Sequence, residues 1–124
     1  MRSKTTRALS TPHEEFLADS FPGGHRSKSS GASFTDPSDV TTDDYVIEAK
    51  ATESKSTTLK LSDWDGIKSK AKNGRRPMIA LRFRDPVMNT TTDLIVKDIN
   101  DELELLERLE VAEEKAWRYD ELCH

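Results

Sequence analysis

The sequence predicts an α/β fold in which helices flank a small mixed β-sheet, in the order α-β-β-α-β-β-α. Three observations support this prediction. Short apolar runs that suit strands alternate with longer stretches in which apolar residues recur at helical spacing. The boundaries between them are rich in residues that favour turns. The chain has 124 residues, 34% apolar and 34% charged, so we expect one domain with a modest core and a heavily charged surface.

The N-terminal part is expected to be a flexible arm followed by a short helix. Residues 1–10 are polar and lack periodicity, which is typical of a loose arm. Thr11 and Pro12 have the character of a helix N-cap and first turn, and they predict a helix over residues 12–21. Residues 22–24 (Pro-Gly-Gly) should end it.

A β-hairpin is predicted next. Residues 25–33 are small and basic, which favours a flexible loop. Strands are expected over residues 33–41 and 45–52, joined by a turn at residues 42–44 (Thr-Asp-Asp).

The second helix follows a polar loop at residues 53–58. Leu59 and Leu61 are expected to re-enter the core, and Ser62 to cap a helix through about residue 71. The apolar face of that helix should carry Trp64, Ile67 and Ala71, with Asn73-Gly74 as its stop.

The C-terminal part is predicted to form two strands and a long helix. Residues 78–83 (Met-Ile-Ala-Leu-Arg-Phe) give the clearest core strand, and a turn at residues 86–90 leads to a partner strand over residues 93–96. A helix is expected over residues 100–121, without a sustained heptad. The domain core then spans residues 11–97. The acidic helix, within residues 98–124, should pack on that core or lie at a dimer contact.

The location is expected to be intracellular and cytoplasmic. No apolar run reaches the roughly 18 residues that a membrane-spanning helix needs. No apolar stretch follows the basic residues at the N-terminus, as a secretory signal would require. Cys123 is the only cysteine, which excludes an internal disulfide and a cysteine zinc cluster.

Charge is distributed unevenly along the chain. The net charge is −4, yet residues 50–85 contain ten basic residues against four acids, whereas residues 93–124 contain eleven acids against four bases. A basic segment of this kind is compatible with binding a polyanion. The alternative is a solvated loop and a solvated helix face.

The most informative residues are Glu48 and Lys50. Side chains two positions apart on a strand point to the same face, so these two should project together, while Ile47, Ala49 and Ala51 face the other way. The structural alternative is a solvent-facing strand that carries an ordinary salt pair.

Asp39 lies nine positions before Glu48, at the far side of the predicted turn. If the two strands pair, Asp39 returns beside Glu48 and Lys50, with the backbone oxygen of Ala49 between them. Two carboxylates and an ammonium group are suited to holding Mg²⁺ against a phosphate, because Mg²⁺ takes a few carboxylates and the lysine can orient a water.

The pattern Asp39-x₈-Glu48-Ala49-Lys50 resembles the PD-(D/E)xK nuclease motif, and residues 11–97 most resemble the small Holliday-junction resolvases of archaea and phages. The resemblance implies a restriction-endonuclease-like fold and cleavage of branched DNA by a homodimer. It also implies Mg²⁺ or Mn²⁺ bound by Asp39, Glu48 and the Ala49 backbone, with Lys50 assisting the nucleophilic water and a glutamate of the first helix completing the set.

Two assignments within the motif stay open. Ser38 separates Pro37 from Asp39, so the Pro-Asp pair is missing and Asp36 is a rival for the aspartate role. For the helix glutamate we prefer Glu14, which shares the apolar face, over its neighbour Glu15. Glu14 could instead be only the capping partner of the residue three positions before it.

Contacts to DNA phosphates are expected at the rim of this region, from Arg26, Lys28, Ser29, Ser30, Lys55 and Lys60. His13 is expected to be exposed, and His25 to contact phosphate or nothing. Two other functions remain alternatives. One is a nuclease of the same superfamily that acts on other DNA structures in replication or repair. The other is a catalytically silent DNA-binding or interaction module with the acidic helix as its partner surface.

Overall fold

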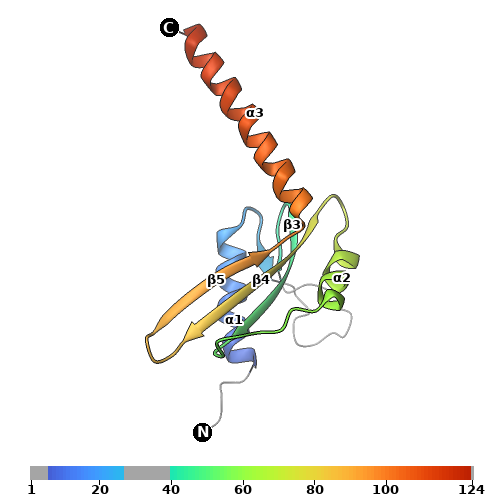
Figure 1. The fold of residues 1–124 in the computed structure, drawn as a ribbon, viewed down its shortest axis with the longest axis vertical. Helices are drawn as coiled ribbons and strands as arrows, with labels where there is room; N and C mark the ends of the chain where they lie inside the picture. The colour runs from blue at the N-terminus through green and yellow to red at the C-terminus, as the bar shows by residue number, and fades with distance from the viewer. Residues whose placement is uncertain (1–5, 27–39, 124) are drawn as a thin grey trace.

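The computed structural model describes residues 6–26 and 40–123 of the chain. A five-stranded mixed sheet runs in the order β1-β2-β3-β4-β5, and helices flank it (Figure 1). The predicted α/β class with a small mixed sheet between helices is therefore confirmed. The elements are α1 (Thr6–Ser20), β1 (His25–Arg26), β2 (Val40–Thr41), β3 (Tyr45–Thr52), α2 (Leu61–Lys70), β4 (Arg76–Asp85), β5 (Thr90–Val96) and α3 (Ile99–Cys123).

The pairing of the strands is antiparallel except at the centre of the sheet. β1 pairs with β2, β2 with β3 and β4 with β5 in antiparallel fashion, whereas β3 and β4 are parallel. Parallel neighbours need a crossover connection, and α2 supplies it. The predicted hairpin between β2 and β3 is present, with Val40 opposite Ile47.

The central strands serve two cores because their side chains alternate between the faces of the sheet. On the α1 face, Leu17 packs with Ile47 and Met78. On the opposite face, Ile67 of α2 packs with Val46 and Ile79. A strand buried on both sides reads as a nearly continuous apolar run, which is why residues 78–83 stood out in the sequence.

Helix α1 begins earlier than predicted. The expected flexible arm at residues 1–10 is wrong for residues 6–10, which are helical, and Thr11 is not an N-cap because Pro12 lies inside the helix. Arg7-Ala8-Leu9 has high helix propensity, and an internal proline removes one backbone hydrogen bond without forbidding the turns before it. The helix ends at Ser20, followed by a turn in which Gly23 has φ +68°.

Residues 25 and 26, predicted as part of a flexible loop, form strand β1 instead. His25 lies opposite Thr41, and Arg26 lies opposite Val40. The amino-acid composition did not predict this strand because pairing with β2 creates it. The outer edge of β2 offers backbone groups with which two residues of almost any kind can pair.

Helix α2 starts at Leu61, with Lys60 rather than Ser62 at the N-cap position. The predicted apolar face is correct, since Ile67 is buried and Trp64 and Ala71 pack beside it. Leu59 and Leu61 do not re-enter the core, because they are 42% and 74% exposed.

Helix α3 projects away from the sheet (Figure 1). Of the two predicted positions for this acidic helix, packing along the core is not observed. The ion pairs that tie α3 to the domain in the described structure all involve its first two turns. A dimer contact remains a prediction. None of the helices in the described ranges is both long and apolar enough to cross a membrane.

Candidate metal centre on strand β3

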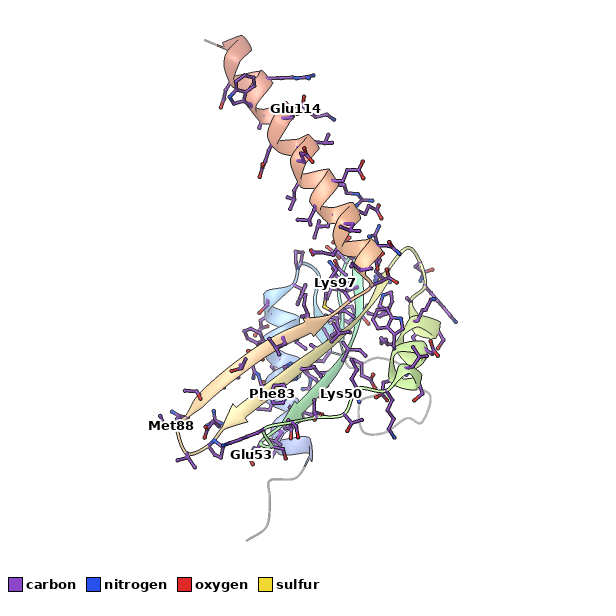
Figure 2. All side chains as sticks on the ribbon, viewed as in Figure 1. Lys50, Glu53, Phe83, Met88, Lys97 and Glu114 are labelled. Atoms are coloured by element: carbon purple, nitrogen blue, oxygen red, sulfur yellow. The ribbon has the colours of Figure 1, made fainter. Side chains whose placement is uncertain are left out.

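Glu48 and Lys50 share the face of β3 that looks toward α2. Val46, two positions before Glu48, packs against Ile67 of that helix. The Nζ atom of Lys50 lies 3.4 Å from the Oδ2 atom of Asp63, also in α2. Figure 2 shows Lys50 on this side of the sheet. The prediction that Glu48 and Lys50 project together is therefore confirmed, and each of them is half-buried.

Ala49 lies between them on the other face, where it packs at the margin of the α1 core. Its backbone is opposite Ala80 in the parallel β3–β4 pair. The small side chain lets the strand lie close under α1 while Glu48 and Lys50 face the α2 side.

The turn before β3 is fixed by the buried side chain of Thr42. Its Oγ1 accepts hydrogen bonds from the backbone N–H groups of Tyr45, at 2.8 Å, and Asp44, at 3.2 Å. The carbonyl oxygen of Thr42 accepts a further hydrogen bond of 2.7 Å from Nε of Arg75. These contacts hold the register of the hairpin that leads into Glu48.

Several predicted site residues lie outside the described residues. They are Asp39, its rival Asp36, and the proposed phosphate-binding residues Lys28, Ser29 and Ser30. The hairpin register itself is described as far as Val40, opposite Ile47.

Asp63 belongs to the site and was not predicted. It lies in the first turn of α2, where its carboxylate accepts the backbone N–H of Lys60 at 3.0 Å while facing Lys50. The Lys60 hydrogen bond lowers the pKa of the Asp63 carboxyl, and the Lys50 charge adds to this effect. Asp63 therefore stays ionised and holds the lysine amine. The available sequence signal was an acid in the first turn of a helix, which is common for electrostatic reasons alone.

Glu14 is buried, with 6% of its surface exposed, whereas Glu15 is exposed. The Oε1 atom of Glu14 lies 3.6 Å from Nε of Arg26 in β1. Glu14 is not the capping partner of Thr11, because Thr11 lies inside α1. This pair belongs to the α1 side of the sheet, whereas Lys50 faces α2. The structure thus favours Glu14 over Glu15 as the buried glutamate. Arg26, a predicted phosphate contact, pairs with Glu14.

The basic segment divides into bound arginines and exposed lysines. Four arginines donate hydrogen bonds of 2.7 to 2.8 Å to protein oxygens: Arg75, Arg76, Arg82 and Arg84. Of the lysines in this segment that lack an ion pair in the described part of the chain, Lys70 is half-buried and four are exposed: Lys55, Lys60, Lys68 and Lys72. A large share of the predicted local positive charge is therefore structural, and the lysines are the groups left for a polyanion.

His13 is fully buried, so the expectation that it is exposed is wrong. Burial, and then the positive charge of Arg82, lowers the pKa of His13 to about 4. Asp93 opposes this only weakly, with its Oδ1 atom 4.0 Å from Nε2 of the ring. Leu9, His13 and Leu17 recur at a spacing of four, and this periodic signal was available in the sequence to place His13 on the buried face. His25 is exposed, with Nδ1 3.2 Å from the Gly23 carbonyl.

Within residues 6–26 and 40–123, no three acidic, histidine or cysteine side chains form a group that could hold a metal ion. What the described part provides is one carboxylate and one acid-tethered amine on a half-buried face. This combination can ligate a hard cation, orient a water and neutralise a phosphate, but a complete ion site needs a further oxygen donor. Comparison with protein-family models, curated proteins and solved structures finds no match to the chain.

Proposed function

We propose that this protein is a metal-dependent endonuclease of the junction-resolving type, which hydrolyses phosphodiester bonds in branched DNA. The proposal includes a restriction-endonuclease-like arrangement of the sheet. The observation that carries it is the common face of Glu48 and Lys50 on a strand that follows a fixed hairpin turn. The parallel β3–β4 pair with its α2 crossover supports the same assignment.

Mg²⁺ or Mn²⁺ would be held by Glu48, Asp39 and the backbone oxygen of Ala49. The β2–β3 pairing supports this set, because Val40, the residue after Asp39 in the sequence, lies opposite Ile47, the residue before Glu48. When bound, the ion lowers the pKa of a coordinated water and polarises the phosphoryl oxygen.

Lys50 would hold the attacking water or the developing phosphoryl charge through its ammonium group. Its pairing with Asp63 fixes the amine against α2, so the amine is oriented before substrate arrives. Glu14 pairs with Arg26 on the α1 side of the sheet, away from the face that carries Lys50, so it is not included in this ion-binding set.

DNA phosphates would meet the exposed lysines at the rim, including Lys55 and Lys60. Each phosphate contact releases counterions, so affinity should fall steeply as salt rises. Two symmetric cuts in a four-way junction require two active sites, so the proposal includes a homodimer.

The test is Mg²⁺-dependent cleavage of a synthetic four-way junction beside a linear duplex of the same sequence. Glu48→Gln and Lys50→Met should each lower the cleavage rate by at least ~100-fold without loss of fold by circular dichroism. Glu110→Gln, a matched change on the exposed part of α3, should leave the rate unaltered. Cleavage that survives Glu48→Gln would overturn the assignment. Equal cleavage of both substrates would favour a nuclease with another DNA target in replication or repair.

A catalytically silent DNA-binding module is the second candidate. The observation in its favour is that exposed lysines are available to phosphate whether or not a metal is held. Salt-sensitive binding of the junction that does not require Mg²⁺, without cleavage in Mg²⁺ or Mn²⁺, would identify it.

A further inference from the structure

In the part of the chain that the structure describes, the ion pairs that anchor helix α3 to the domain lie at its base. Arg76 of β4 donates to Asp101 at 3.3 Å and to Glu104 at 2.7 Å, and both acids lie in the first two turns. Farther along, the described ion pairs lie inside the helix itself, Arg108 with Glu104 and Arg118 with Glu114. Figure 2 shows Glu114 far from the sheet. Most helices in proteins gain their stability from packing an apolar face against another element. The free part of α3 therefore lacks the partner that such a helix needs.

Helix α3 carries an apolar stripe that begins at the end of the anchored base and runs along the free part, and we name it the α3 stripe. It consists of five residues spaced by four, three, four and three positions: Leu105, Leu109, Ala112, Ala116 and Tyr119. All five are exposed, with Leu109 at 49% and Tyr119 at 69%. This is the a and d spacing of a two-stranded coiled coil, over two heptads. The stripe is shorter than the repeat of about three to four heptads from which a coiled coil is inferred in a sequence.

The charges beside the stripe specify the partner. Arg108 and Lys115 lie along one side of it, in the g positions, and Glu113 and Asp120 lie along the other side, in the e positions. In a parallel pair, a g residue meets the e residue five positions later on the other helix. Arg108 would then face Glu113 of a second copy, and Lys115 would face Asp120. In an antiparallel pair, Arg108 would face Lys115 and the charges would repel.

We propose that α3 is a self-association helix, through which two copies of this chain form a parallel two-stranded coiled coil along the α3 stripe. The pair of Arg108 with Glu104 in its own helix, at 2.6 Å, is compatible with this, because a guanidinium has several donors. Two heptads bury on the order of 1,000 Å² or less, near the lower limit for specific interfaces. The dimer should therefore be reversible and concentration-dependent. It names a surface for the homodimer included in the proposed function, but the observations behind it do not rest on nuclease activity.

The first test is sedimentation equilibrium of the full chain over a range of concentrations, without DNA or divalent metal. We expect a monomer–dimer equilibrium that Leu109→Asp shifts to monomer, with a dissociation constant raised at least ~100-fold. Leu103→Asp is the matched control, since Leu103 is exposed on the same helix but outside the stripe, and it should leave the equilibrium in place. A monomer at every concentration, or equal effects of the two substitutions, would overturn the proposal.

The second test determines orientation. Lys115→Glu should weaken the parallel dimer by about tenfold, and adding Asp120→Lys should restore it. The same Lys115→Glu change would strengthen an antiparallel dimer.

Ala116→Cys in a Cys123→Ser background should form a disulfide-linked dimer on oxidation, because position 116 faces itself only in the parallel pair. Val111→Cys, outside the stripe, should not. A tighter Lys115→Glu dimer without the Ala116→Cys cross-link would refute the parallel arrangement. These tests measure the mass of the assembly without DNA, so failure of the dimer proposal is distinguishable from failure of DNA cleavage.

Discussion

His13 makes the stability of the fold depend on pH in a window that few other groups affect. Its ring is fully buried, and neither ring nitrogen has a hydrogen-bond partner within the described residues. The pKa falls from 6.5 in an unfolded chain to about 4 in the fold, because burial and then the Arg82 charge disfavour the imidazolium. The unfolded chain therefore binds a proton at this position below about pH 6.5, while the folded chain does not until about pH 4.

The sign follows from that difference in proton binding. Where the unfolded state binds more protons, the free energy of unfolding rises with pH, so acidification should destabilise the protein. Integrating between pH 7 and pH 5 with these two pKa values gives a loss of about 2 kcal/mol from His13 alone. The carboxyl groups whose pKa is lowered, those of Asp63 and Glu104, add to the loss only at more acidic pH.

The assay is urea unfolding at a series of pH values, comparing the native sequence with His13→Leu. The native protein should lose about 2 kcal/mol of unfolding free energy across this window, and the variant should lose most of that slope. His25→Gln should retain the slope, since His13 and its surroundings are unchanged. A native protein whose unfolding free energy is flat between about pH 7 and pH 5 would refute the placement of a neutral His13 in the core.

Three further predictions concern single side chains. Gly23→Ala should destabilise the fold by about 1 to 2 kcal/mol in urea unfolding, because φ is +68° and a Cβ there would overlap the Asp43 carboxylate. Gly66→Ala should stabilise it by about 0.5 to 1 kcal/mol in the same assay, because Gly66 is inside α2 and its Cβ would meet nothing within 4 Å; a loss would show that α2 is packed there. If the nuclease proposal holds, Asp63→Asn should lower kcat about tenfold while junction affinity is not weakened, since the variant keeps a cap acceptor but releases Lys50. Unchanged kcat would show that Asp63 does not position the amine.

Local patterns in the sequence predicted correctly those elements whose buried face is set by the alternation of apolar and polar residues. The face shared by Glu48 and Lys50 follows from the period of a strand, and the hairpin follows from a polar turn between two apolar runs. The buried face of α2 around Ile67 follows from helical spacing. In each case the deciding interaction lies within a few residues of the chain, or is the burial of one continuous face.

Contacts between residues far apart in the chain could not be predicted from the sequence. Asp63 meets Lys50 only because α2 crosses back over β3, which no spacing along the chain encodes. Arg82 is removed from the basic surface by Asp93 in the next strand, and a charge count assigns it to solvent. β1 exists because β2 offers it an edge, not because His25 or Arg26 favours strand structure.

The contact at the base of α3 affects both the proposed dimer and the proposed nuclease site. Arg76 begins β4. Its hydrogen bond to Glu104, with a smaller effect of Asp101, raises the pKa of Arg76, and the same bond lowers the pKa of Glu104, so the joint remains charged and paired. β4 lies beside β3 in parallel register, with Glu48 opposite Ile79. In the proposed dimer, the same joint that directs α3 toward its partner would also fix the direction in which each Glu48–Lys50 face points. Because a four-way junction presents its two scissile bonds at a defined separation, this joint, and not the stripe itself, would determine whether the two faces can act on one junction together.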